Sequence, residues 1–210
     1  MTRNIIALLT FVVFASSAQA QFNRIGDQGS VALSYVQVNA PNTSSWQGAD
    51  LTALVPITKT DISGQTIKLN GDVQSQFVQT HGGVADRNIS TIGVGLTAWA
   101  NFDFDKGAWA LAPYFRAGIQ GNSGNIYAVN KSYTAYSVEP GLVVRMGDFY
   151  GLAAYQYGEG FNSDFGSVIN MPKVGVGVNL TKNFAIEARY EMNRGSYNFD
   201  RTVAGITYKF

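Results

Sequence analysis

The last ten residues, Arg201-Thr202-Val203-Ala204-Gly205-Ile206-Thr207-Tyr208-Lys209-Phe210, alternate between two kinds of side chain. Every second residue from Thr202 to Phe210 belongs to a nearly apolar row, and the residues between them form a mixed polar row. Successive side chains of a β-strand point to opposite faces, so this stretch predicts a strand with one face against an apolar environment. The same alternation recurs along most of the chain.

Ten alternating segments are separated by turn signals. They cover approximately residues 28–38, 46–57, 65–79, 88–102, 108–121, 132–146, 149–157, 170–180, 184–193 and 200–210. The connections 103–107, 147–148 and 181–183 are tight, whereas 121–131 and 158–170 are longer and rich in Gly, Asn and Ser. Short turns at one end and longer loops at the other are typical of a transmembrane β-barrel.

The number of strands is predicted to be even, because both ends of an antiparallel barrel chain then lie on the same side. Ten strands satisfy this condition, and so do eight. The first two segments are the weakest, since Pro41 and Pro56 lie nearby and the connection 58–65 is long. The alternative prediction is therefore an eight-stranded barrel with an irregular start.

The first twenty residues have the pattern of a secretory signal peptide, with Arg3, an apolar run over 5–15 and Ala18-Gln19-Ala20. This pattern divides the chain into a signal peptide at 1–20 and one domain at 21–210. No apolar run reaches the roughly 20 residues of a membrane-spanning helix. Cysteine is absent, which excludes disulfides and thiolate metal sites.

The charge balance argues against a nucleic-acid partner. The chain has fifteen Lys and Arg, and without Arg3 fourteen remain against fourteen Asp and Glu. No net field therefore attracts a polyanion. Charged residues make up 14% of the chain, compared with about 25% in soluble domains. This low proportion of charged residues means that charged side chains do not cover the exterior.

The strands of a soluble β-sandwich also alternate between apolar and polar side chains. The residue types on the second face therefore decide between a sandwich and a membrane barrel. A soluble sheet would show many Lys and Glu residues there, but the partner rows contain residues such as Thr91, Gly93, Ala112 and Tyr114, which suit a narrow interior. The opposite rows carry no charge: Ile92, Val94, Leu96, Ala98, Ala100, Phe102, Trp109, Leu111, Pro113, Phe115, Ala117 and Ile119. These rows are assigned to lipid.

Aromatic residues concentrate near both ends of the segments. Phe102, Trp109, Phe149, Phe184 and Phe210 fall at the short-turn end, and Tyr35, Tyr133, Tyr157 and Tyr190 fall toward the loops. Two aromatic girdles at the membrane interfaces are expected from this distribution. A general preference of aromatics for strands explains their number but not their concentration at the ends.

The polar rows carry a predicted network of charges inside the barrel. Its members are Arg116, Glu139, Arg145, Lys173, Glu187, Arg189, Glu191 and Arg201. Tight turns fix which residues lie opposite each other. The 147–148 turn sets Arg145 against Tyr150 and Glu139 against Gln156. The 181–183 turn sets Glu187 against Gly177, Arg189 against Gly175 and Glu191 against Lys173.

The other two hairpins extend this network. A symmetric last hairpin brings Arg201 to the second side of Glu191. The 103–107 turn places Arg116 against Gly95, with Glu139 nearby. Because an unpaired buried charge costs several kcal/mol, ion pairing is the favoured interpretation. The alternative is that these charges line a conduction path or a ligand site, since ten strands fall between the filled and the water-filled barrels.

Patterns that would support catalysis are weak. His81, the single histidine, lies in a Gly-rich stretch with Asp86 close by, and a solvated loop histidine is the favoured interpretation. The Gly-x-Gly pairs fall inside strands and not before a helix, so they do not predict a phosphate-binding turn. The prediction is a protein that is not an enzyme and has no cofactor or metal.

The exported start, the alternating strands, the absent Cys and the terminal Ile206-Thr207-Tyr208-Lys209-Phe210 resemble the small outer-membrane β-barrels of Gram-negative bacteria, of the opacity and outer-membrane protein X type. The resemblance implies an all-β, closed, antiparallel, up-and-down transmembrane barrel in the bacterial outer membrane. It also implies contact with outer-membrane lipid and lipopolysaccharide. In that family the barrel-assembly machinery recognises a C-terminal signature, which here is Tyr208 and Phe210.

Three functions follow as hypotheses. The first is a non-enzymatic outer-membrane barrel with a structural or surface-interaction role and an ion-paired lumen. The second is a narrow porin-like channel in which Arg116, Glu139, Arg189 and Glu191 control passage. The third, least favoured, is a lipid-modifying enzyme that uses His81.

Overall fold

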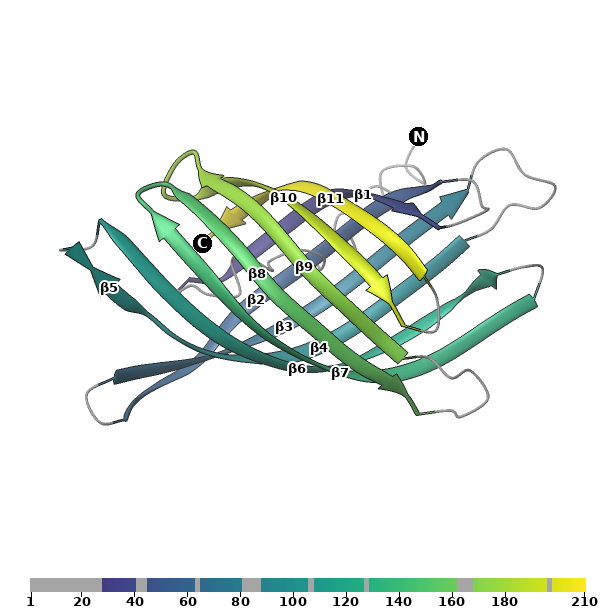
Figure 1. Ribbon diagram of the computed structural model, residues 1–210, viewed down its shortest axis with the longest axis horizontal. Helices are drawn as coiled ribbons and strands as arrows, with labels where there is room; N and C mark the ends of the chain where they lie inside the picture. Colours follow the sequence, from purple (N-terminus) through teal and green to yellow (C-terminus); the bar gives the residue numbers. More distant parts are fainter. Residues whose placement is uncertain are drawn as a thin grey trace, which may run out of the picture.

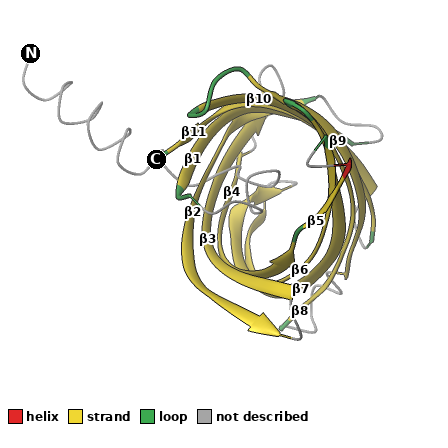
Figure 2. Cartoon of the chain, turned by 90° about the vertical axis from the view of Figure 1, so that its left-hand side faces the viewer, coloured by secondary structure: helices red, strands yellow, loops and turns green. Residues whose placement is uncertain are grey.

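The chain is a closed β-barrel, seen from the side in Figure 1 and along its axis in Figure 2. The computed structural model describes residues 28–40, 45–62, 65–80, 88–105, 108–126, 129–161, 168–195 and 198–210. Its strands are β1 (Ser30–Asn39), β2 (Trp46–Ile62), β3 (Gln65–Thr80), β4 (Asn88–Ala100), β5 (Phe102–Phe104), β6 (Trp109–Ile126), β7 (Val129–Met146), β8 (Phe149–Gly160), β9 (Val168–Asn179), β10 (Phe184–Arg194) and β11 (Asn198–Lys209).

These elements form ten barrel strands. The short β5 follows β4 after Asn101 and pairs with the same neighbour, β6. All neighbouring strands are antiparallel, and the pairings β1–β11 and β4–β6 complete the ring. The prediction of a closed up-and-down barrel with ten strands is confirmed. The eight-stranded alternative is wrong, because β1 and β2 are continuous strands with partners on both sides.

The strands are strongly staggered. Following the register once around the barrel from Asn122 on β6 returns to β6 at Ala110, twelve residues away. The path runs through Thr91, Gln76, Asp50, Ser34, Gly205, Glu187, Gly177, Tyr150 and Arg145. Strand number and stagger together set the tilt and width of a barrel. Ten strands with this stagger enclose a small interior that large side chains can span.

The long connection predicted at 58–65 is mostly strand. β2 continues beyond the start of β1, whose Ser30 pairs with Leu54, and stays paired with β3 as far as Ile62 and Gln65, while β3 pairs with β4 from Ile67 onward. The β2–β3 register shifts between Pro56 and Thr58. A bulge of this kind accommodates Pro56, which has no N–H to donate to the ladder. The proline therefore marks an irregularity within the strand and not its end.

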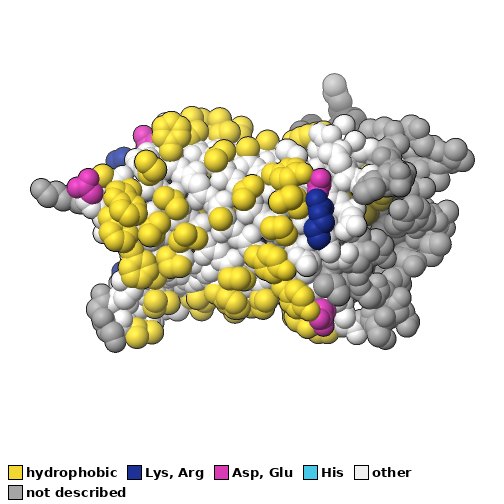
Figure 3. All heavy atoms as spheres, in the orientation of Figure 1, with side chains coloured by type: hydrophobic (Ala, Val, Ile, Leu, Met, Phe, Trp, Pro, Cys, Tyr) yellow, Lys and Arg dark blue, Asp and Glu magenta, His cyan; other side chains and the backbone are white. Residues whose placement is uncertain are grey.

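The exterior of the barrel is apolar between its two ends. Ile92 is 64% exposed, Phe115 50%, Val176 65% and Ile206 56%. On the face shown in Figure 3, apolar side chains cover the middle of the wall, and charged side chains lie toward the ends. Such a surface would be unfavourable in water and suits hydrocarbon. The rows assigned to lipid from the sequence are exposed or partly exposed, except for Ala100, which is buried at 7% exposure.

Exposed aromatic side chains lie at both ends of this apolar band. Phe102, Trp109, Phe149, Phe184 and Phe210 are exposed at the short-turn end. At the loop end Tyr35, Tyr157 and Tyr190 are exposed, together with Tyr136 and Tyr155. The two predicted girdles are therefore present, although the side chain of Tyr133 lies outside the described residues.

None of the described residues forms a helix with the length and apolarity needed to cross a membrane.

Candidate functional site

The interior of the barrel has an ionic centre between apolar ends. The inward residues of β7 show the order of these layers: Val143 is in the apolar layer at the short-turn end, Glu139 in the charged layer and Ala135 in the apolar layer at the loop end. The short-turn apolar cluster consists of Trp99, Ala112, Tyr114, Val143, Tyr150, Leu152 and Ala185. The loop-side apolar clusters consist of Val36, Trp46, Val78 and Val203, and of Ala135, Ile169 and Met171.

We call the charged layer between these clusters the ionic belt. It comprises Asp50, Asp72, Arg116, Glu139, Lys173, Arg189, Glu191 and Arg201, each of which is at most 9% exposed. Four carboxylates therefore lie among four cations. A balanced set of this kind limits the free energy lost by removing charges from water, provided that partners meet directly.

Arg116 and Asp72 form the best-defined pair of the belt. Arg116 Nη2 lies 2.6 Å from Asp72 Oδ1, and Nε lies 3.0 Å from Oδ2, so the contact is bidentate. The two residues belong to β6 and β3, on either side of β4. The guanidinium lies over Gly95 of β4, where an added Cβ would be 2.6 Å from Arg116 Cζ. The glycine thus provides the space in which the ion pair forms.

Glu139 and Lys173 form a second direct pair. Lys173 Nζ lies 2.7 Å from Glu139 Oε2, and the Tyr114 hydroxyl donates to Oε1 at 2.8 Å. The exposed fractions of Glu139 and Lys173 are 0% and 1%. Tyr114 itself lies over Gly141, where an added Cβ would be 2.3 Å from its ring. This pair joins β7 and β9 across β8.

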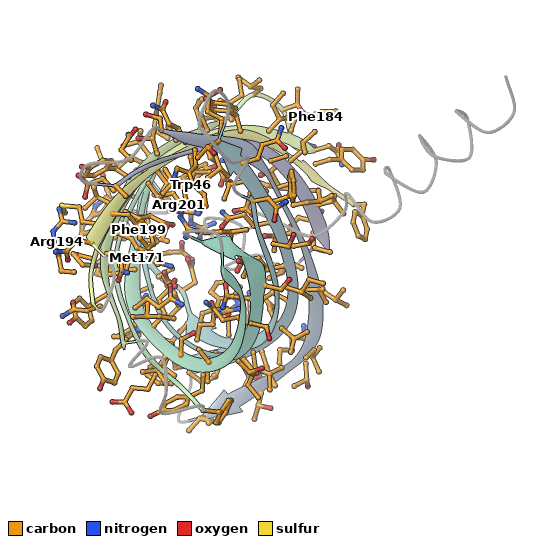
Figure 4. All side chains as sticks on the ribbon, turned by 90° about the vertical axis from the view of Figure 1, so that its right-hand side faces the viewer. Trp46, Met171, Phe184, Arg194, Phe199 and Arg201 are labelled. Carbon is orange, nitrogen blue, oxygen red and sulfur yellow. The ribbon has the colours of Figure 1, made fainter. Side chains whose placement is uncertain are left out.

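Glu191 binds two guanidinium groups. Arg189, two residues earlier on β10, and Arg201, opposite on β11, both contact its carboxylate. Arg201 Nη1 also donates to Gln76 Oε1 at 3.1 Å, which links β11 to β3 across β1 and β2. Figure 4 shows Arg201 inside the ring of strands near Trp46, Met171 and Phe199 at the loop-side mouth.

The remaining predicted network residues, Glu187 and Arg145, lie closer to the short-turn end. Glu187 accepts hydrogen bonds from the Tyr150 hydroxyl at 3.0 Å and from Thr207 Oγ1 at 3.2 Å. Arg145 donates to Asn101 Oδ1. These hydrogen bonds join each charged group to neutral side chains.

Most of the predicted registers are observed. Arg145 lies opposite Tyr150, Glu191 lies opposite both Lys173 and Arg201, and Glu187 and Arg189 lie opposite Gly177 and Gly175. The Glu191–Arg201 register depends on a symmetric last hairpin, and each of the others depends on a turn whose centre could be located from Gly-Asp or Thr-Lys-Asn. The ladder register on either side of Pro140 also places Glu139 opposite Gln156.

The register predicted for Arg116 is wrong by two residues. Arg116 lies opposite Thr97, and Gly95 lies opposite Gly118. The hairpin turns later than expected, because β5 continues to Phe104 and the positive φ of 49° occurs at Asp105. The long side chain nevertheless reaches back over Gly95.

Sequence reasoning missed two belt residues, Asp50 and Asp72. Asp72 supplies the partner of Arg116, whereas Glu139, which lies opposite Arg116, pairs with Lys173. Both aspartates are inward residues of alternating segments, so the period-two pattern could have found them. The partner of Asp72 lies two strands away, and a hairpin register does not report such a contact.

The described residues contain no group of three His, Cys, Asp or Glu side chains that could hold a metal ion. His81, the residue of the enzyme hypothesis, and the predicted signal peptide 1–20 lie outside the described residues. What the belt can do chemically is therefore electrostatic: its groups can tie strands together or set the polarity of the lumen.

Comparison with known proteins gives a likeness in fold. No family model and no curated protein matches the sequence. Among solved structures, the transport unit of the autotransporter AIDA-I from Escherichia coli has a TM-score of 0.51 at 11% identity, covering 96% of this chain and 97% of that chain. The β domain of the Bordetella autotransporter BrkA has a TM-score of 0.49 at 15% identity, covering 88% and 100%. Ail from Yersinia pestis has a TM-score of 0.38 at 15% identity, covering 87% and 98%.

The first of these structures supports the same closed barrel architecture. The lipid-exposed band, the aromatic girdles and the closed ring of strands agree with this likeness. The chain is an integral outer-membrane β-barrel protein.

Proposed function

We propose that this protein is a non-enzymatic outer-membrane barrel with a closed lumen, and that its role is structural or surface interaction. The observation that carries the proposal is the ionic belt, which is packed between apolar clusters at both ends. The direct pairs join β3 to β6, β7 to β9 and β10 to β11. These links brace the barrel from within.

Burial of the belt supports a closed lumen. Glu139, Glu191 and Asp50 are 0% exposed, so no water-sized space touches their side chains. An aqueous channel would keep such groups hydrated, because removing a charge from water without a partner costs several kcal/mol. Aqueous pores are known in barrels of about 16 strands or more, which are much wider than this one.

A surface role is supported by the loop end of β6 and β7. The β7–β8 register ends at Ala135 and Gly160, and Phe161 N donates one further hydrogen bond to Thr134 O; among the described residues the part of β7 before Thr134 pairs only with β6. At the base of this hairpin an open hollow of about 350 Å³ is lined by Ser90, Ile92, Gly121, Asn122, Ser123, Ser132 and Thr134. Hydroxyl groups in an open hollow offer hydrogen bonds to an external polar partner.

The competing function is a narrow pore, which the buried charges of a ten-stranded barrel would also suit. Recording current across planar bilayers that contain the refolded full chain separates the two. We expect no steady conductance. A steady conductance that changes in size or ion preference in Arg116→Gln or Glu191→Gln would overturn the closed lumen. Arg194→Gln, outside the lumen, is the matched control.

We further propose that the barrel-assembly machinery recognises Tyr208 and Phe210, and that lipid and lipopolysaccharide contact the exterior. Phe210 is 62% exposed and Tyr208 45%, with ring centroids 6.4 Å apart. Phe210→Ala should lower the amount of folded barrel in cells but not refolding of the purified chain. Phe184→Ala, which removes an aromatic from the same girdle, is the control. Equal losses in both variants would contradict a specific signature.

A further inference from the structure

The open hollow at the loop end of β4, β6 and β7 is lined mainly by two rows of small side chains on the outer face of the wall. The first row is Ser90, Ser123 and Ser132, which lie opposite one another across the three strands. The second row is Ile92, Gly121 and Thr134. Neighbouring strands lie about 4.8 Å apart, and alternate residues of one strand lie about 7 Å apart. Four hydroxyl groups are therefore within reach of one small ligand.

The hollow begins where the apolar band of the exterior ends. Val94 of β4, Ile119 of β6 and Tyr136 of β7 are exposed residues of that band. The next outward residues toward the loops belong to the second row of the hollow, and the three serines follow them. Tyr136 is also part of the loop-end aromatic girdle, and such girdles mark the membrane interfaces. The hydroxyl groups thus lie at the level of the headgroups of the outer leaflet.

The surroundings of the hollow favour an uncharged ligand. All seven lining residues are uncharged, so none of them supplies a cation to bind a phosphate. Glu159 lies opposite Tyr136 and accepts a hydrogen bond from its hydroxyl at 3.1 Å. A negative charge in the hollow would be repelled by this carboxylate. Serine and threonine hydroxyls both donate and accept hydrogen bonds, as the hydroxyl groups of a sugar do.

Apolar side chains border the hollow on three sides. Phe77 of β3 lies opposite Ser90, and the ring of Tyr136 packs against that of Phe161, with centroids 5.6 Å apart. Ile92, at the edge toward the apolar band, is 64% exposed. A free sugar would occupy the hydroxyl groups but leave this apolar edge uncovered. A sugar that is linked to hydrocarbon chains satisfies both parts of the surface.

We propose that this hollow binds the uncharged sugar headgroup of an outer-leaflet glycolipid. Ser90, Ser123, Ser132 and Thr134 exchange hydrogen bonds with the sugar, and the hydrocarbon chain lies along Ile92 toward the apolar band. The volume of about 350 Å³ falls in the range of small-molecule sites. This inference rests on the surface role proposed above and names the ligand of the same hollow.

The test adds monoglucosyl diacylglycerol to the refolded full chain in zwitterionic detergent and counts bound lipid by native mass spectrometry. We expect one glucolipid per barrel and weaker binding of phosphatidic acid and of free glucose. Loss of one neutral hydrogen bond should weaken binding about fivefold in Ser123→Ala, and more in the double variant Ser123→Ala, Ser132→Ala. Thr202→Ala removes an exposed hydroxyl opposite the girdle residue Tyr190 on another part of the wall, and it should bind as the natural chain does.

A second variant fills the hollow without disturbing the barrel. A Cβ added at Gly121 would have only Ile92 O near it, at 3.9 Å, so Gly121→Leu should fold and abolish binding. Gly151→Leu is the matched control, since its added Cβ would also have its nearest atom at 3.9 Å, but at the short-turn end.

Four outcomes would overturn the proposal. They are no glucolipid binding, equally tight binding of phosphatidic acid, equally tight binding of free glucose, and equal losses in Gly121→Leu and Gly151→Leu. Failure of the glucolipid to bind would leave the closed lumen in place, and a steady conductance would leave this site in place. The two proposals therefore fail separately.

Discussion

Asp72 and Asp50 are buried on neighbouring strands of the barrel wall, but their hydrogen bonding differs. On β3, Asp72 receives a bidentate contact from Arg116. On the neighbouring β2, neither oxygen of Asp50 has a well-formed hydrogen bond among the described residues, although Gln74, Arg189 and Arg201 lie near it. Both residues are almost completely buried, at 3% and 0% exposure. Burial alone therefore does not decide whether a charge is paired.

The difference lies in what the neighbouring strands offer. Gly95 leaves the space through which Arg116 reaches Asp72. Asp50 lies between Ser34 and Gln76 in the register, and Gln76 already accepts from Arg201. Several polar atoms on the same wall also lack partners among the described residues: Ser30 Oγ, Ser34 Oγ, Trp46 Nε1 and Thr52 Oγ1. The wall of β1 and β2 is thus held mainly by its backbone ladders.

The largest effect is expected from Asp72→Ala. It leaves the Arg116 guanidinium buried without its carboxylate, which should lower the free energy of unfolding by about 3–5 kcal/mol. Urea unfolding of the refolded barrel, followed by tryptophan fluorescence, measures the loss. Combining Asp72→Ala with Arg116→Leu should recover much of the stability, because no lone charge remains. A loss below about 1 kcal/mol in the single variant would show that the pair does not brace the barrel.

Gly95→Ala tests the space beneath the same pair. The added methyl group would lie 2.6 Å from Arg116 Cζ and must displace the guanidinium from Asp72. Overpacking of this kind should cost about 1–3 kcal/mol in the same unfolding experiment. Gly121→Ala is the control, since its nearest neighbour would be 3.9 Å away. Similar stability of the two variants would mean that Arg116 moves freely.

Asp50→Asn should change the stability by no more than about 1 kcal/mol, because no direct hydrogen bond is lost. Relief of the cost of burying the carboxylate opposes the lost attraction of Arg189 and Arg201. Asp72→Asn, with the same chemical change on the paired wall, is the matched comparison and should lose clearly more. Equal losses would show that long-range attraction, and not direct contact, stabilises the belt.

The smallest effect is expected from Arg194→Gln on the outside. Arg194 Nη2 lies 2.8 Å from Asp200 Oδ1, but the two side chains are 47% and 35% exposed. Solvent screening limits such pairs to less than about 1 kcal/mol, and added salt should reduce the difference further. Unfolding curves at low and high salt test this. A loss as large as that of Asp72→Ala would remove the distinction between exposed and buried pairs.

Local patterns were sufficient for the strands and their faces. The final segment, with Ile206 outward and Val203 inward, lies as its alternation predicts, because side-chain direction in a strand depends only on position. The turn at Gly147-Asp148 could be located because glycine adopts the positive φ of 60° found there. The hairpin before β6 could not, since its positive φ falls on Asp105, a residue that gives a weaker signal.

The order of residues by itself determined a membrane barrel of ten or eight strands, its lipid-facing rows and most of its nearest-neighbour registers, because a period of two and short turns act over a few residues. Only the closed tertiary structure decided which charges meet. Arg116 binds Asp72 across β4, and Arg201 reaches Gln76 across β1 and β2. These contacts join strands far apart in the chain, and they depend on the curvature that brings inward side chains together.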